Sequence, residues 1–127
     1  GDDGNDINDS WYSTDGATWT QASAGALWNG RWGHTAVVAL SYNLPYPMNL
    51  DPAIFIAGGI GGDGQRKSDV WATTNGSQWT QGGGTIVTAV WGHTSVVFQR
   101  RFSTQQPEKW IIGGNASNGR LDISSSY

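Results

Sequence analysis

The feature that most constrains this chain is a segment written twice. The stretch "SWYSTDGATWTQ", residues 10 to 21, returns sixty residues later as "VWATTNGSQWTQ", residues 70 to 81, with both tryptophans, the glycine and the closing Thr-Gln retained. Two further blocks repeat nearby, because "WGHTAVV" at 32–38 matches "WGHTSVV" at 91–97, and "FIAGG" at 55–59 matches "WIIGG" at 110–114. Self-similarity at a fixed spacing indicates a repeat architecture in which one supersecondary unit recurs.

Each repeat has the pattern of four short strands. The apolar, β-branched or alternating stretches are followed by a Trp-Thr-Gln segment that closes the unit, and no stretch has a sustained helical period. In the best-defined repeat the expected strands are 34–40, 53–59, 69–74 and 78–81. The sequence therefore predicts an all-β fold of antiparallel, four-stranded sheets.

The hairpin that joins the third and fourth strands carries Asp15-Gly16 in one copy and Asn75-Gly76 in the other. Such pairs favour tight two-residue turns in which both central residues have positive φ. On this interpretation aspartate can become asparagine because both tolerate the left-handed conformation. An acid needed for catalysis or metal binding would be harder to exchange.

The order "GRWGHTAVV", "IFIAGG", "SDVWATTNGSQWTQ" resembles a kelch repeat, with its Arg-x-Gly-His strand, its Gly-Gly strand end and its closing tryptophan. The resemblance implies a β-propeller with one four-stranded blade per repeat. It divides the chain into the last part of a preceding blade at 1–30, a complete blade at 31–81 and a partial following blade at 82–127. Val90 departs from the pattern, because it stands where the complete repeat has Arg31. The hairpins are also similar to shortened Asp-box turns of sialidases.

Closure of such a propeller needs more chain than these 127 residues supply. Propellers have at least about four blades, of roughly 50 residues each for the kelch type, whereas this chain holds about two repeats. We therefore expect it to form part of a larger propeller, completed by further blades of the same or another chain.

The repeated tryptophans favour packing between neighbouring sheets, since a bulky ring recurs at the same position of each repeat. Trp28 has no aromatic counterpart and is the better candidate for an exposed ring.

His34 and His93 occupy equivalent places without nearby metal ligands, which favours a histidine hydrogen-bonded within each blade over a zinc site. The diglycines at 58–59 and 113–114 end strands, so they favour close backbone approach rather than phosphate binding.

Composition narrows the function classes. The net charge is −3 with seven Lys and Arg, and no apolar stretch is long enough to span a bilayer, so neither nucleic acid nor a membrane span is expected. Cysteine is absent and Glu108 is the only glutamate, so no thiolate site, paired glutamates or catalytic triad stands out. No cofactor or metal site is predicted. The acidic loop "GDDGNDINDS" offers oxygen ligands for calcium, but its spacing favours a solvated loop.

Three Asn-x-Ser sequons point to a location. They lie at Asn8, Asn75 and Asn115, in predicted loops or turns, and favour an extracellular or secretory-pathway setting. A cytoplasmic kelch protein is the alternative.

Two long connections between the first and second strands, at 41–52 and 100–108, would emerge on one face of the propeller. Long loops on a rigid scaffold often carry function, and Tyr and Arg are enriched in binding hot spots. Tyr42, Tyr46, Arg101 and Phe102 are the predicted contacts for a protein or glycan partner, although tolerated insertions would have the same length. The sequence thus favours a non-catalytic binding or structural module. The alternative is part of a glycan-active or oxidase-like propeller enzyme whose catalytic residues lie outside this chain.

Overall fold

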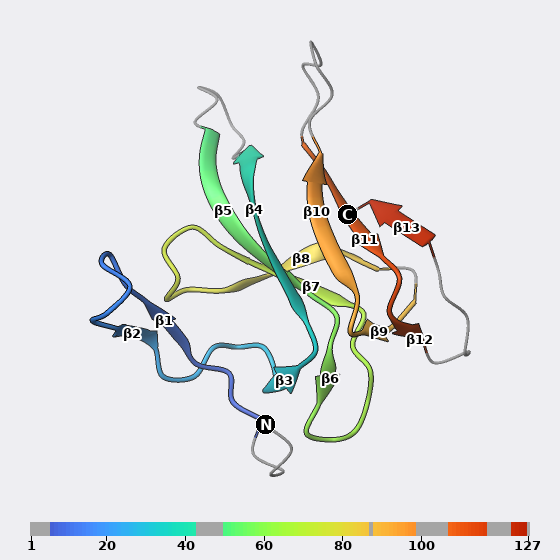
Figure 1. The fold of residues 1–127 in the computed structure, drawn as a ribbon, viewed down its shortest axis with the longest axis horizontal. Coiled ribbons are helices and arrows are strands. Elements are labelled where there is room, and N and C mark those ends of the chain that lie inside the picture. The colour runs from blue at the N-terminus through green and yellow to red at the C-terminus, as the bar shows by residue number, and fades with distance from the viewer. Residues whose placement is uncertain (1–5, 43–49, 87, 99–106, 117–122, 127) are drawn as a thin grey trace.

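The computed structural model describes residues 6–42, 50–86, 88–98, 107–116 and 123–126, and within these ranges the chain is built of antiparallel strands without a helix. The predicted all-β class is therefore confirmed. Figure 1 shows three successive units along the chain, an N-terminal hairpin, a central sheet and a C-terminal sheet. No segment within the described ranges is a helix that could cross a membrane.

The central unit is one four-stranded antiparallel sheet whose strands are adjacent in chain order. Its strands are β4 (Thr35–Tyr42), β5 (Leu50–Ala57), β7 (Asp69–Thr73) and β8 (Thr80–Thr85). This is the four-stranded sheet that the sequence predicts for residues 31–81, although β8 runs on to Thr85. The strand pair β4 and β5 is in register over its whole length, from Thr35 opposite Ala57 to Tyr42 opposite Leu50.

The C-terminal unit repeats the first three strands of this plan. It contains β10 (Thr94–Phe98), β11 (Glu108–Ile112) and β13 (Ile123–Ser126), paired in that order. Each unit also has a short strand pair at the base of its long hairpin. These pairs are β3 (Arg31–Trp32) with β6 (Ile60–Gly61), and β9 (Val90–Trp91) with β12 (Asn115–Ala116).

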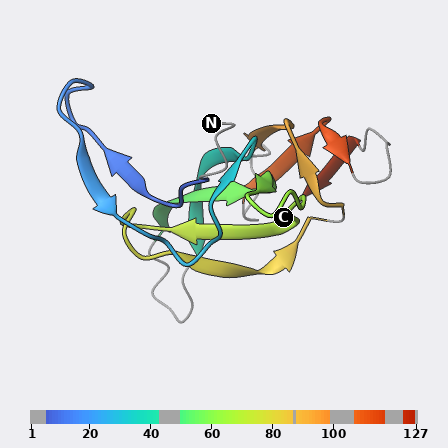
Figure 2. The ribbon, with the colours of Figure 1, turned by 90° about the horizontal axis from the view of Figure 1, so that it is seen from below.

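The N-terminal unit is a single hairpin of β1 (Ser10–Tyr12) and β2 (Thr20–Ser23). Its register matches that of β7 and β8, since Trp11 lies opposite Gln21 and Trp71 lies opposite Gln81. Both hairpins have an irregularity in the register immediately before this tryptophan. In Figure 2 the hairpin projects from the side of the molecule remote from the C-terminal sheet.

The connection at each hairpin tip differs from the predicted two-residue turn. Pairing stops at Tyr12 and Thr20, so the loop spans residues 13–19, and the second copy spans 73–79 in the same way. The side-chain oxygen Oδ1 of Asp15 accepts hydrogen bonds from the backbone N–H groups of Ala17 and Thr18, both at 2.8 Å. Asn75 Oδ1 does the same for Ser77 and Gln78.

The exchange of Asp15 for Asn75 therefore has a different reason from the predicted one. What the loop needs is a short side chain that ends in an acceptor oxygen, and both residues supply it. Gly16 and Gly76 have the same φ of 75°, which allows the chain to reverse just after this residue.

Two apolar clusters cover opposite faces of the central sheet, as the alternation of side chains along a strand requires. One joins Ala57 and Val70 of the central sheet to Ile86, Val90 and Ile111, and so packs the central unit against the C-terminal unit. Phe55 extends this interface, with the Lys109 ammonium 4.3 Å from the centre of its ring. The second cluster lies on the N-terminal side and consists of Ile56, Trp28 and Trp79, with Trp71 and Ala26 against it.

Trp28 is therefore not the exposed ring that the sequence favours. Only 5% of it is accessible, and its ring packs edge-on against Trp79 with 5.8 Å between centroids. The guanidinium of Arg31 lies 5.8 Å from the same ring. The lack of a repeated counterpart did not indicate exposure, because a residue between two repeats can be buried by both of them.

The diglycine at 58–59 confirms the expected close approach of backbone. A Cβ on Gly58 would lie 2.6 Å from the carbonyl oxygen of Val90, and one on Gly59 would lie 2.9 Å from that of Trp32. The N–H of Gly59 donates to the Val90 carbonyl at 2.8 Å. A side chain at Gly58 would push the central and C-terminal units apart, whereas one at Gly59 would clash with Trp32 and His34 of its own unit.

Both outer faces of this arrangement carry uncovered apolar side chains. On the N-terminal side of the central sheet these are Val38, with 62% of its surface exposed, Leu40 and Ile54. On the far side of the C-terminal sheet they are Val96, Phe98 and Ile112. Ile54 corresponds to Lys109 of the C-terminal sheet and Ile112 to Ala57 of the central sheet, and both counterparts are buried where the two sheets pack together.

Candidate functional site

A polar pocket of about 440 Å³ lies at the base of the central unit, where three segments of the chain meet. Its lining is formed by short polar residues and glycines, namely Asp6, Asn8, Asn29, Gly30, Gly61, Gly62 and Asp63. This pocket has no signature in the sequence, because the three segments that form it are far apart along the chain and share no motif.

Two interactions hold the N-terminal wall of the pocket in place. Asn8 Nδ2 donates to the carbonyl oxygens of Ala26 at 2.8 Å and Trp28 at 3.1 Å. At Gly30 the backbone of Asp6 comes so close that an added Cβ would lie 2.1 Å from its carbonyl oxygen. The oxygen Oδ2 of Asp6 is buried and has no hydrogen-bond partner in the part of the chain that the structure describes.

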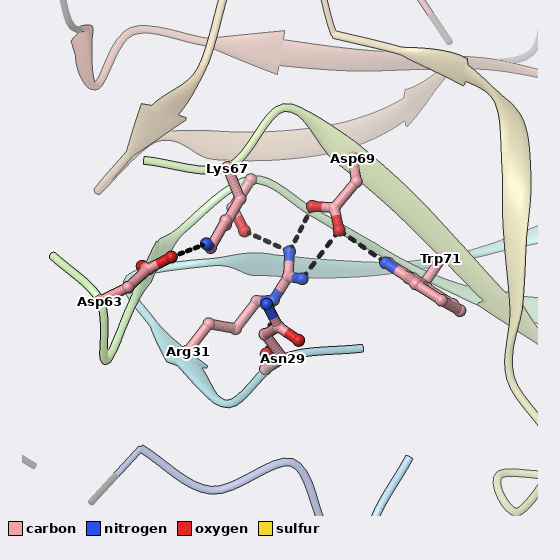
Figure 3. A network of polar contacts seen from close by, with 7 residues as sticks. Asn29, Arg31, Asp63, Lys67, Asp69 and Trp71 are labelled. Carbon is pink, nitrogen blue, oxygen red and sulfur yellow. Dashed lines mark hydrogen bonds and ion pairs between the residues drawn. The ribbon is translucent and has the colours of Figure 1, made fainter. Parts of the chain in front are cut away.

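The floor of the pocket adjoins a network centred on Arg31 (Figure 3). The guanidinium binds both carboxylate oxygens of Asp69, with Nη1 to Oδ1 at 2.6 Å and Nη2 to Oδ2 at 2.9 Å. Its remaining donors reach the carbonyl oxygens of Gly58 at 3.0 Å and Asn29 at 3.1 Å. Asp69 Oδ2 also accepts a hydrogen bond from Trp71 Nε1 at 2.7 Å. The Arg31–Asp69 ion pair therefore connects β3, at the start of the repeat, with β7.

The electrostatics of this network favour the charged forms. Burial opposes ionisation of Asp69, but the hydrogen bonds from Arg31 and Trp71 outweigh it and hold the pKa of Asp69 below its usual value. Beside it, Lys67 Nζ lies 2.7 Å from Asp63 Oδ2, and this hydrogen bond together with the N–H of Gln65 lowers the pKa of Asp63. The pocket therefore has one carboxylate neutralised by lysine and a second, on Asp6, that is not paired with any cation among the described residues.

Asp6, from the acidic N-terminal loop, and Asp63 both line the pocket. The described residues contain no group of three or more His, Cys, Asp or Glu that could hold a metal ion. Asn8 and Asn29 add neutral oxygen and nitrogen atoms. These groups can donate hydrogen bonds to a polar ligand and accept them from it.

The two histidines differ. The ring of His34 lies 6.3 Å from that of Trp28 and interacts with Arg31 of its own repeat, whereas His93 connects two repeats, contrary to the expected bond within one blade. His93 is buried, and its Nε2 is hydrogen-bonded to Thr35 Oγ1 at 2.7 Å across the interface between central and C-terminal units. Burial lowers the pKa of His93, and the neighbouring His34 lowers it further. A neutral His93 therefore belongs to the packed interface.

The predicted contact residues fall mostly outside the described residues. Tyr42 is the last residue of β4, and nothing is described of its side chain, while Tyr46, Arg101 and Phe102 lie in the ranges 43–49 and 99–106. The structure does place the start of both long connections at the same end, because β4–β5 and β10–β11 rise side by side in Figure 1. The expected contacts stay a prediction.

The three sequon asparagines have different surroundings. Asn75 is exposed at a hairpin tip, whereas Asn8 is partly buried and its Nδ2, the atom that would carry a glycan, donates two hydrogen bonds. Asn115 is exposed, and its Oδ1 accepts from Arg66 Nη2 at 2.8 Å.

The Arg31–Asp69 pair was missed as a contact by sequence reasoning, although both residues belong to the repeat pattern. A signal was present, since Arg31 is the position that Val90 replaces in the next repeat. No family model matches this chain, and neither a curated protein nor a solved structure shows significant similarity to it.

Proposed function

We propose that this chain is a non-catalytic binding or structural module that forms part of a kelch-like β-propeller. One observation supports this most directly. The chain contains one complete sheet between two incomplete copies of the same plan, with apolar side chains exposed on both outer faces. Stacking of sheets through such faces is how the central and C-terminal units already pack. Further blades, or a partner protein, would cover the remaining faces in the same manner.

The long connections at 41–52 and 100–108 are the proposed contact loops for a protein or glycan partner, and an extracellular or lumenal setting accords with exposed sequons at Asn75 and Asn115. Such loops are carried by the stacked hairpins β4–β5 and β10–β11. Mass spectrometry of the protein from its native source checks the setting, and unmodified asparagine at Asn8, Asn75 and Asn115 would contradict it.

The module hypothesis is tested by association. Val38→Glu places a charge at the centre of the uncovered N-terminal face, so it should abolish self-association or binding of further blades in sedimentation velocity. Thr74→Glu, at an exposed loop position, is the matched control and should leave association unchanged. A wild-type chain that sediments as a single monomer and melts cooperatively in calorimetry would contradict the proposal.

A further inference from the structure

The two copies of the Trp-Thr-Gln hairpin differ in one charged contact. Asp69 accepts hydrogen bonds from both Nη1 and Nη2 of Arg31 and from Trp71 Nε1. Asp9, sixty residues earlier, makes the equivalent bond to Trp11, with Nε1 to Oδ2 at 2.7 Å. Within the described part of the chain no cation is paired with Asp9. The first copy therefore retains the acceptor of the network and lacks its arginine.

The strand beside Asp9 is also open. Strand β7 is paired on both sides, with β5 and β8, whereas β1 is paired with β2 alone among the described strands. A strand edge of unpaired N–H and C=O groups is a template for a further strand. In the second copy this place is taken by the hairpin of β4 and β5, which begins just after Arg31.

The closing tryptophans of the two hairpins also differ in exposure. Trp79 is 7% exposed because Trp28, three residues before Arg31, packs against it, but its counterpart Trp19 is 58% exposed. Trp11 and Tyr12 are also more than half exposed. A charged acceptor, an open strand edge and an uncovered ring thus coincide on one small hairpin.

We propose that the β1 edge is a docking site for a β-hairpin that lies outside these 127 residues and whose leading strand is preceded by an aromatic residue and, three positions later, an arginine, as Trp28 and Arg31 precede β4. The arginine would form a bidentate ion pair with Asp9, as Arg31 does with Asp69. The aromatic ring would cover Trp19. Bidentate pairing of this kind adds geometric specificity to the strand contact. This inference rests on the proposed function and names the partner of one face.

A second copy of this chain does not fit the site. Its Arg31 is committed to its own Asp69, with 1% of the arginine side chain exposed. Its other long hairpin, β10 with β11, has Val90 where the arginine would stand. Neither hairpin of a second copy therefore presents a free arginine to Asp9.

The probe is a synthetic peptide with the sequence of residues 26–61, which contains Trp28 and Arg31, closed by a disulfide between added terminal cysteines. It should bind the intact 127-residue protein in calorimetric titration, and hydrogen exchange should show new protection at Ser10–Tyr12. Asp9→Asn keeps an acceptor for Trp11 but removes the charge, and it should weaken binding about tenfold or more. Asp15→Asn is the control and should change nothing, because asparagine occupies the equivalent position in the second copy.

The charge contact is then isolated by changing both partners. The peptide variant Arg31→Gln should lose about the same factor against the wild-type protein, and no further factor against Asp9→Asn. The same cycle is repeated with the peptide sequence joined to the N-terminus of the protein through a flexible linker, and read as thermal stability. This second format keeps the test valid if the free peptide does not fold.

Each other outcome has a definite meaning. Absence of binding in both formats, or equal binding to Asp9→Asn and wild type, overturns the proposed site. Loss of binding in Asp69→Asn but not in Asp9→Asn also overturns it, because the peptide would then be replacing the protein's own β4–β5 hairpin. Val38→Glu tests sheet stacking and does not involve Asp9. A failure of the proposed function would therefore be seen in that variant, and a failure of the docking site in Asp9→Asn.

Discussion

The hairpins β1–β2 and β7–β8 have nearly the same sequence, the same register and the same loop, yet they differ in burial. In both, a side-chain oxygen organises the loop and a tryptophan binds the aspartate two residues before it. Among the described residues, only in the second hairpin does that aspartate bind an arginine and does the closing tryptophan pack against another ring. The comparison separates what local sequence determines from what neighbouring strands supply.

The largest loss of stability is expected from breaking the Arg31–Asp69 ion pair, which distinguishes the two hairpins. Asp69→Ala leaves Arg31 buried without its counter-charge and should lower the free energy of unfolding by about 3–5 kcal/mol. Asp9→Ala removes only a bond to an exposed indole and should cost less than about 1 kcal/mol. Urea denaturation of both variants measures the difference, and equal losses would show that the arginine contact adds nothing.

The closing tryptophans should differ almost as much. Trp79→Ala opens a cavity against Trp28 and Ile56, and should cost about 3 kcal/mol or more. Trp19→Ala removes a ring that is more than half exposed, so its cost should stay within about 1 kcal/mol. The same denaturation series tests this, and a comparable loss at Trp19 would indicate that this ring is already covered in solution.

A smaller effect is expected from pH at the packed interface. The pKa of His93 is lower in the folded chain than its usual 6.5, so the unfolded chain takes up the proton first as the pH falls. Stability should therefore be constant above that value, decrease as the pH drops below it, and level off below the folded-state pKa. His93→Gln should reduce the slope of melting temperature against pH in this range and leave the part due to His34, whose pKa burial also lowers. An unchanged slope would place the titration elsewhere.

The smallest effect should come from exchanging the loop residues between copies. Asp15→Asn and Asn75→Asp both keep the oxygen that accepts two backbone N–H groups, so neither should change the unfolding midpoint measurably near neutral pH. At acidic pH the pKa of Asp15, which the N–H groups of Thr18 and Ala17 hold well below its usual value, keeps the carboxylate charged. Asn75→Ala removes the acceptor and should disorder the loop in amide exchange, a change that Asn75→Asp would not reproduce.

Much of the fold could be predicted because its signals are local. The β-branched, apolar runs from Thr35 to Leu40 and from Ala53 to Ala57 identify strands, and the repeated tryptophans identify equivalent hairpins. The tip of each hairpin was predicted incorrectly, since the Asp-Gly and Asn-Gly pairs have the composition of a two-residue turn. There the hydrogen bonds of a side chain determined the longer loop, and pair statistics do not contain them.

The sequence by itself determined the repeat, the strand order and the acceptor at each loop, because these depend on residues within a few positions of one another. Tertiary structure decided which tryptophan is buried, which aspartate has an arginine, and where Asp6 and Asp63 meet in one pocket. Those properties depend on contacts between residues some twenty to sixty positions apart. Two copies of one local pattern can therefore fold alike and still differ in what their surfaces are free to bind.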